Sequence, residues 1–289
     1  MRVVHLTDLH FQCPPTVSEL FHLKRLMGST NLYLLGRKSK FNLTVQRAAI
    51  QKAIELKPDL VIITGDISAQ ALRAEFELAR AELDPLFASV PTILQAGNHD
   101  TYITKGPPPD MIELFGEWMT EPEAGLKHFE DVAVLCVESC RSSLLSQGYV
   151  APESLRKATQ LLQQNNRPFT FFCMHYPLLD RRGNLYGPKT RAIKNAPEVL
   201  DWLKHQTGMH IYLHGHEHHG YRTELQLKDT TIPSINPGSS GYAHDPVKDR
   251  RAHMALYNID GSSISSIERF RYNEGSFEDE PNGPFSTGR

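Results

Sequence analysis

Short apolar runs alternate with stretches of helical spacing along the first part of the chain. The runs at 2–6, 59–64 and 91–94 are almost wholly apolar, which is typical of strands covered on both faces. Between them, the apolar residues at 45–56 and 72–87 recur with the period of an amphipathic helix. Strands joined by helices of this length predict right-handed crossovers and a mainly parallel sheet in the first half of the chain.

The same alternation continues in the second half. Further strands are predicted at 132–138, 169–174 and 210–213, and further helices at 155–164 and 196–205. Residues 101–128 contain three consecutive prolines, so we expect a loop there with one short helix at 112–119. Apolar and polar residues then alternate at 253–259 and 263–272, which predicts an antiparallel hairpin.

The sequence has no internal repeat and no linker that clearly divides it into two units. We therefore expect a single domain over residues 1–272 of the 289-residue chain. Residues 273–289 are acidic and rich in glycine and proline, so we expect a disordered tail.

The net charge of -2 lacks the basic excess that is typical of nucleic-acid binding, so no specific nucleic-acid partner is predicted. The cysteines show no C-x-x-C spacing and indicate free thiols in a reducing compartment. They are Cys13, Cys136, Cys140 and Cys173. No apolar stretch reaches the roughly 18 residues that span a bilayer, and no signal-peptide core is present. We therefore expect a cytoplasmic location.

A basic amphipathic insertion at about 20–42 follows the first predicted strand, and no acidic residue occurs from Leu20 to Ile54. This insertion would suit an anionic substrate or the acidic inner face of a membrane, which it would contact peripherally. It would equally suit a solvated helical pair that covers the core with long basic side chains, or a dimer contact. The oligomeric state is left open by the sequence.

Polar residues with metal-ligand chemistry follow the predicted strands. They are Asp8, His10, Asp66, Asn98, His175, His216 and His218. Open α/β sheets place their sites at the carboxyl ends of the strands, so these side chains are expected to converge. Oxygen and nitrogen ligands without thiolate suit manganese, iron or zinc, and seven of them are about right for two ions.

These residues occur in five ordered blocks, which together resemble the motifs of the calcineurin-like metallophosphoesterases. The blocks are Asp8-Leu9-His10, Gly65-Asp66, Gly97-Asn98-His99-Asp100, His175 and Gly215-His216-Glu217-His218. The resemblance implies an α/β fold in which two mixed β-sheets pack as a sandwich flanked by helices, giving four layers. It places the metals at the carboxyl ends of the strands.

The resemblance also implies a role for each residue. One ion would be held by Asp8, His10, Asp66 and His218, and the other by Asp66, Asn98, His175 and His216. Asp66 would bridge the ions, and a metal-bridging hydroxide would attack phosphorus. His99 would protonate the leaving oxygen or stabilise its charge, and Asp100 would hold His99 in orientation.

Within this family, the sequence is most similar to bacterial phosphodiesterases of the cyclic-nucleotide type. The tyrosine that purple acid phosphatases have after the bridging aspartate is absent, as is the Asp-Arg-Gly run of protein phosphatases. Two alternatives are a nucleotide-lipid pyrophosphatase resembling the UDP-diacylglucosamine hydrolases, for which the insertion would be a lid, and a non-catalytic metal-binding scaffold. The expected partner is a small phosphate ester, either a nucleotide or a nucleotide-lipid. Arg141, Arg181 and Arg182 are candidates for binding a second phosphate.

Overall fold

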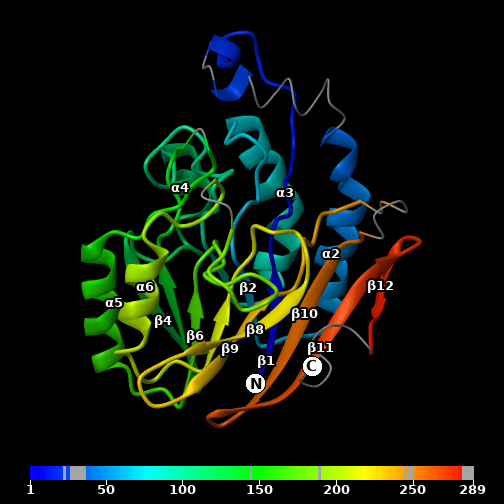
Figure 1. Ribbon diagram of the computed structural model, residues 1–289. Helices are drawn as coiled ribbons and strands as arrows, with labels where there is room; N and C mark the ends of the chain where they lie inside the picture. The colour runs from blue at the N-terminus through cyan, green and yellow to red at the C-terminus, as the bar shows by residue number, and fades with distance from the viewer. Residues whose placement is uncertain are drawn as a thin grey trace.

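The computed structural model describes residues 1–21, 24–26, 37–143, 145–187, 190–243, 245 and 250–281. Its strands form two mixed sheets that lie face to face (Figure 1). The first contains β1 (Arg2–Leu6), β2 (Leu60–Ile63), β3 (Thr92–Leu94), β10 (His253–Asp260), β11 (Ser263–Asn273) and β12 (Ser276–Asp279). The second contains β4 (Ala124–Phe129), β5 (Val132–Val137), β6 (Phe169–Cys173), β7 (Ile211–Leu213), β8 (Tyr221–Gln226) and β9 (Thr231–Asn236).

The order and direction of the strands test the predicted parallel arrangement. The first sheet runs β12-β11-β10-β1-β2-β3, and the second runs β4-β5-β6-β7-β9-β8. Strands β1, β2 and β3 are parallel to one another, as are β5, β6, β7 and β9. The parallel first half predicted from the sequence is therefore confirmed.

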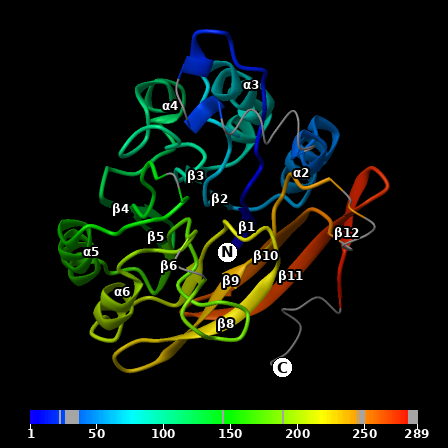
Figure 2. The same ribbon diagram turned by 45° about the horizontal axis from the view of Figure 1, so that its top comes forward.

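Helices cover the outer faces of both sheets (Figure 2). They are α2 (Leu43–Glu55), α3 (Arg73–Ser89), α4 (Pro109–Phe115), α5 (Pro152–Gln164) and α6 (Ala196–Leu203), with short 3-10 turns at Glu19–Phe21 and Arg37–Lys40. Helices α2 and α3 pack on the first sheet, and α5 and α6 pack on the second. The expected four-layer sandwich is therefore observed.

The alternation of side chains along each strand produces three apolar layers. In β1, Val4 and Leu6 pack towards α2 and α3, whereas Val3 faces the second sheet. In β6, Phe172 packs towards α5 and α6, whereas Phe171 faces the first sheet. Both faces of the central strands are therefore apolar, as expected when successive side chains point to opposite sides of a buried strand.

Several local expectations need correction. Strands β4 and β8 were not predicted, because β4 contains a glycine and β8 carries charged residues on its outer face. The short helix α4 spans Pro109–Phe115 rather than 112–119, because a proline at its first position starts it and the chain leaves the helix after Gly116.

The expected disordered tail is also corrected in part. Residues 276–279 form β12, which pairs antiparallel with β11 and buries Phe277 against the first core layer. One buried aromatic and a paired backbone outweigh the polar composition of this segment. Residues 282–289 lie outside the described residues, so the tail prediction is not tested there.

Most of the predicted basic insertion at 20–42 likewise lies outside the described residues, which include only 21, 24–26 and 37–42 of it. All four cysteines are free, as predicted. Among the described residues, no helix has both the length and the apolar character that a bilayer span needs.

Candidate metal centre

The loops that follow β1, β2, β3, β6 and β7 meet at one edge of the sandwich. The amide of Asp8 donates to the Gly65 carbonyl (3.0 Å), and the amide of Gly215 donates to the His175 carbonyl (3.0 Å), which joins neighbouring strand ends within each sheet. The ring of His175 reaches across to the first sheet, where Nδ1 lies 2.8 Å from the carbonyl oxygen of Thr64. This edge brings all seven predicted ligands together.

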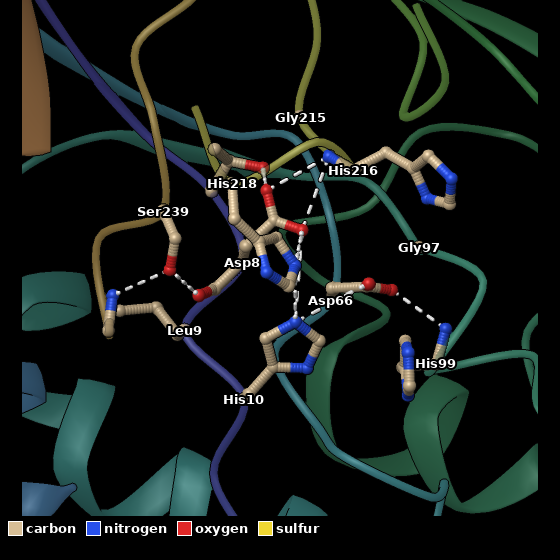
Figure 3. Close-up of polar contacts among 12 residues, drawn as sticks. Asp8, Leu9, His10, Asp66, Gly97, His99, Gly215, His216, His218 and Ser239 are labelled. Atoms are coloured by element: carbon tan, nitrogen blue, oxygen red, sulfur yellow. Dashed lines mark hydrogen bonds and ion pairs between the residues drawn. The ribbon is translucent and has the colours of Figure 1, made fainter. Parts of the chain in front are cut away.

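Four of these residues form a first cluster of donor atoms. One ligand atom from each of Asp8, His10, Asp66 and His218 lies within 4.8 Å of the others. The Nε2 atoms of His10 and His218 are 3.1 Å apart, and His218 Nε2 is 3.3 Å from Asp8 Oδ1. Figure 3 shows these side chains converging, whereas the ring of His216 is directed away from them.

The ring of His216 belongs to a second cluster around the other side of Asp66. His216 Nδ1 is 2.7 Å from Asn98 Oδ1, and His175 Nε2 is 3.1 Å from the same oxygen. His175 Nε2 also lies 3.4 Å from Asp66 Oδ2. The Nε2–H of His216 donates to the Arg191 carbonyl (3.1 Å), which leaves Nδ1 without a proton in the neutral ring.

The atoms that face one another in both clusters are hydrogen-bond acceptors. Nδ1 of His10 donates to the Ser68 carbonyl (3.2 Å) and Nδ1 of His175 to the Thr64 carbonyl, so in the neutral rings both Nε2 atoms offer lone pairs. Lone pairs this close repel one another unless a proton or a metal ion lies between them. The donor set, which contains oxygen and imidazole nitrogen but no thiolate, therefore fits metal ions.

The electrostatics of the two aspartates agree with this fit. Burial acts to raise the pKa of Asp8 and of Asp66, but His218 beside Asp8 and His175 beside Asp66 outweigh it and hold both pKa values well below their usual range. Burial likewise acts to lower the pKa of His175, yet the charges of Asp66 and Asp8 raise it to about 9. The buried edge thus carries negative charge that attracts a cation.

Backbone strain marks the same residues. Among the seven predicted ligands, Asp8, His10, Asp66, His216 and His218 all have φ between 52° and 74°, the left-handed region that side chains with a Cβ rarely adopt. Each such residue costs about 1–2 kcal/mol relative to an ordinary conformation. Among the described residues, seven other non-glycine positions also have positive φ, but five of the seven predicted ligands share it, which agrees with side chains held in place for function.

Substitutions of His218 test whether its positive φ destabilises the folded protein. We expect His218→Gly to be about 1 kcal/mol more stable than His218→Ala, because glycine adopts φ 57° without a Cβ clash. Urea denaturation of the metal-free proteins measures this difference. At the helical residue Gln51 in α2 the order should reverse, with glycine less stable than alanine by about 1 kcal/mol. An alanine variant of His218 as stable as the glycine variant would contradict the strain argument.

Two glycines of the predicted motifs allow the loops to approach one another. A Cβ on Gly97 would lie 2.2 Å from Asp66 Oδ1, and a Cβ on Gly215 would lie 2.0 Å from Thr7 Oγ1 and 2.6 Å from Asp8 Oδ2. Any side chain at either position would push an aspartate out of place. These glycines therefore contribute to the site, because the absence of a Cβ leaves room for the aspartates.

The surroundings of His99 correct one expected role. Nδ1 of His99 lies 2.6 Å from the Ala69 carbonyl oxygen, so this carbonyl orients the ring. The carboxylate of Asp100, which was expected to do so, instead accepts hydrogen bonds from the Gly97 amide (2.8 Å) and from the amide and hydroxyl of Ser68 (both 2.8 Å). Asp100 thus fastens the loop after β3 to the loop after β2.

A pocket of about 530 Å³ opens over both clusters. Its wall includes Asp66, Asn98, His99, His216 and His218, together with Lys40, Phe41, Arg181, Arg191, His219, Tyr242 and Arg250. Burial, followed by the charges of Arg250 and Arg181, lowers the pKa of His219 to about 4. The pocket wall therefore gathers several cationic side chains, namely Lys40, Arg181, Arg191 and Arg250.

Of the three arginines in the pocket wall, only Arg181 is among the candidates predicted from the sequence. The other two candidates lie elsewhere, since Arg141 packs over the ring of Tyr149 and neither Arg141 nor Arg182 lines the pocket. Arg191 and Arg250 were missed, because loop arginines carry no local pattern that distinguishes a pocket wall from solvent.

Comparisons with known structures identify the fold. A dimetal phosphatase from Danio rerio superposes with a TM-score of 0.57 over 96% of this chain and 97% of that one, at 14% identity. A purple acid phosphatase from yellow lupin superposes with a TM-score of 0.59 over 96% of this chain and 52% of that one, also at 14% identity. At these identities the likeness concerns the fold alone.

Comparisons of sequence give evidence on the family as well as on the fold. A probable cyclic nucleotide phosphodiesterase from Synechococcus sp. is 27% identical over 168 residues, which are 57% of this chain and 59% of that protein. The match thus spans less than two thirds of the relative. The sequence profile of the calcineurin-like phosphoesterases matches residues 1–220, which include every residue of the two donor clusters. The chain therefore belongs to the calcineurin-like phosphoesterase family.

Proposed function

We propose that this protein is a phosphodiesterase that depends on two metal ions. The observation that carries the proposal is the arrangement of two acceptor clusters on either side of Asp66, in the floor of one pocket and beside His99. Paired metal sites that share a carboxylate are a common device for hydrolysing phosphate esters. The name of the Synechococcus relative supports a diester as the substrate.

In this proposal the first ion would be held by Asp8, His10, Asp66 and His218, and the second by Asp66, Asn98, His175 and His216. Asp66 would contribute to both sites, because Oδ2 lies 3.7 Å from His10 Nε2 and 3.4 Å from His175 Nε2. When bound, divalent ions supply Lewis acidity at a phosphoryl oxygen and lower the pKa of water.

His99 has two roles in this proposal, one for its main-chain amide and one for its ring. The amide of His99 donates to Asp66 Oδ1 (2.7 Å) and fixes the shared carboxylate. The hydrogen bond from His99 Nδ1 to the Ala69 carbonyl (2.6 Å) fixes the ring of His99 in the pocket wall. We infer that the protonated His99 ring gives the Nε2 proton to the leaving oxygen, or stabilises its charge by a hydrogen bond.

Hydrolysis of bis-p-nitrophenyl phosphate and of p-nitrophenyl phosphate, measured side by side after removal of metal and reloading with manganese, tests the proposal. We expect a clear preference for the diester and a loss of activity on chelation that manganese restores. Equal hydrolysis without metal, or a preference for the monoester, would refute the phosphodiesterase assignment.

A nucleotide-lipid pyrophosphatase acting at a membrane surface is the second candidate, and one feature favours it. Val17, Phe21 and Leu26 are exposed to 78%, 87% and 47%, next to the basic Lys24. Lys24, which lies between Phe21 and Leu26 in the sequence, packs over the ring of Tyr102, which in turn stacks on His99, so Lys24 brings this segment of the chain close to the site. Hydrolysis of a diphosphate-linked nucleotide lipid in vesicles, without hydrolysis of the chromogenic diester, would favour this candidate.

A further inference from the structure

Three arginines approach the pocket from two separate connections of the second half of the chain. Arg181 and Arg191 lie between β6 and α6, and Arg250 lies between β9 and β10. Among the described residues, none of the three forms an ion pair with a carboxylate. The acidic side chains of the pocket wall are Asp66, which belongs to the donor clusters, and Glu217, which accepts a hydrogen bond from Tyr186.

Two of these arginines are held by their neighbours. The guanidinium of Arg250 bonds to the ring of His219 and lies 5.9 Å from the ring centre of Tyr242. Arg191 has φ 71°, and both of its main-chain polar groups are used: the amide donates to the Leu145 carbonyl (3.0 Å), and the carbonyl accepts from His216. The position of Arg191 is therefore coupled to a predicted metal ligand.

The pocket wall also contains a polar group without a partner. Tyr242 is 1% exposed, and its buried hydroxyl makes no hydrogen bond with the described residues. An unsatisfied buried hydroxyl is costly, and a ligand or an ordered water would satisfy it. This group lies beside Arg250, on the wall that the arginines form.

The charge of this wall exceeds what a simple diester needs. A phosphodiester carries one negative charge, which the metal side of the pocket would neutralise. Guanidinium groups match the oxygens of a phosphate monoester, which they bind through paired N–H donors. We propose that the substrate carries a second phosphate group apart from the diester that is cleaved, and that Arg181, Arg191 and Arg250 bind it. This inference rests on the proposed function and specifies its substrate class.

A matched pair of substrates tests the inference. Thymidine 5′-(p-nitrophenyl phosphate) and the same ester with a 3′-phosphate share the leaving group and the reacting phosphorus, and differ only by the second phosphate. We expect the 3′-phosphorylated ester to have a kcat/KM about tenfold higher or more, through a lower KM, because hydrogen bonds between charged groups are the stronger class.

Substitutions assign this preference to the arginines. Arg181→Gln, Arg191→Gln and Arg250→Gln should each reduce the preference severalfold or more, whereas Arg182→Gln, which changes the exposed neighbour of Arg181 outside the pocket wall, should keep it. Equal hydrolysis of the two esters by the unsubstituted protein, or equal slowing of both by the three arginine variants, would overturn the inference.

A binding measurement keeps this test separate from the proposed function. If neither ester is hydrolysed, the proposed function fails. Calorimetry with the metal-free protein then still tests whether the arginines bind the second phosphate. Thymidine 3′,5′-bisphosphate should then bind about tenfold tighter than thymidine 5′-monophosphate, and the three variants should lose the difference. Equal affinities for the two nucleotides would overturn the inference in that case as well.

Discussion

Replacing Asp66 with asparagine is expected to slow diester hydrolysis roughly a thousandfold, a loss of about 4 kcal/mol of transition-state stabilisation. Asparagine retains Oδ1, which accepts the His99 amide, so the loop keeps its hydrogen bond. It replaces Oδ2, which lies 3.7 Å from His10 Nε2 and 3.4 Å from His175 Nε2, by an N–H donor. The shared negative charge of the two clusters is thereby lost.

Metal content and rate should change together in this variant. Elemental analysis after reloading is expected to give fewer than two ions per chain, against two for the unsubstituted protein. Asp84→Asn, at a half-exposed position of α3, should leave both quantities unchanged. An Asp66→Asn protein that kept two ions and its full rate would exclude Asp66 as the shared ligand.

Glu280→Gln is expected to cost about 3 kcal/mol of stability, because it breaks a buried ion pair and leaves one charge uncompensated. Glu280 Oε2 lies 2.9 Å from Arg269 Nη1 and 3.5 Å from His253 Nε2, and the side chain of Arg269 is 6% exposed. Arg269 Nε also donates to the Pro237 carbonyl (3.2 Å), in the connection that follows β9. The pair therefore joins the segment after β12 to this connection.

Denaturation of Glu280→Gln beside Glu278→Gln measures this effect. Glu278 is exposed on β12, two residues before Glu280, and its substitution should change stability by less than about 0.5 kcal/mol. Equal losses in the two variants would show that the buried pair contributes nothing beyond the surface carboxylate.

The pH dependence of this difference has a definite sign. Burial acts to raise the pKa of Glu280, but the hydrogen bond from His253 and the charge of Arg269, with Arg271 nearby, lower it below its ordinary value of 4.5. A carboxyl group whose pKa falls on folding stabilises the protein above its unfolded pKa. The advantage of the unsubstituted protein over Glu280→Gln should thus be complete near neutral pH and shrink as the pH falls below 4.5.

The sequence by itself determined the alternation of strands and helices, the parallel first half and the identity of the clustered side chains, because these follow from local patterns. Apolar runs such as 59–64, bounded by helical segments, are typical of strands covered on both faces, and the carboxyl ends of parallel strands share one edge of a sheet. Asp8 and His10, like His216 and His218, are two positions apart in the sequence, so finding one strand end places both. The resemblance then ordered these motifs across most of the chain.

Only the tertiary structure decided the features that depend on contacts between distant segments. Asp100 accepts a hydrogen bond from Ser68, His99 donates one to the Ala69 carbonyl, and Arg250 bonds to the ring of His219. No local sequence pattern predicts these contacts, because each joins segments that are distant in the sequence. Strand β12 likewise forms because β11 offers a free edge and the core accepts Phe277. Local sequence fixes what a side chain is able to do, whereas packing fixes what it touches, and the substrate class depends on the latter.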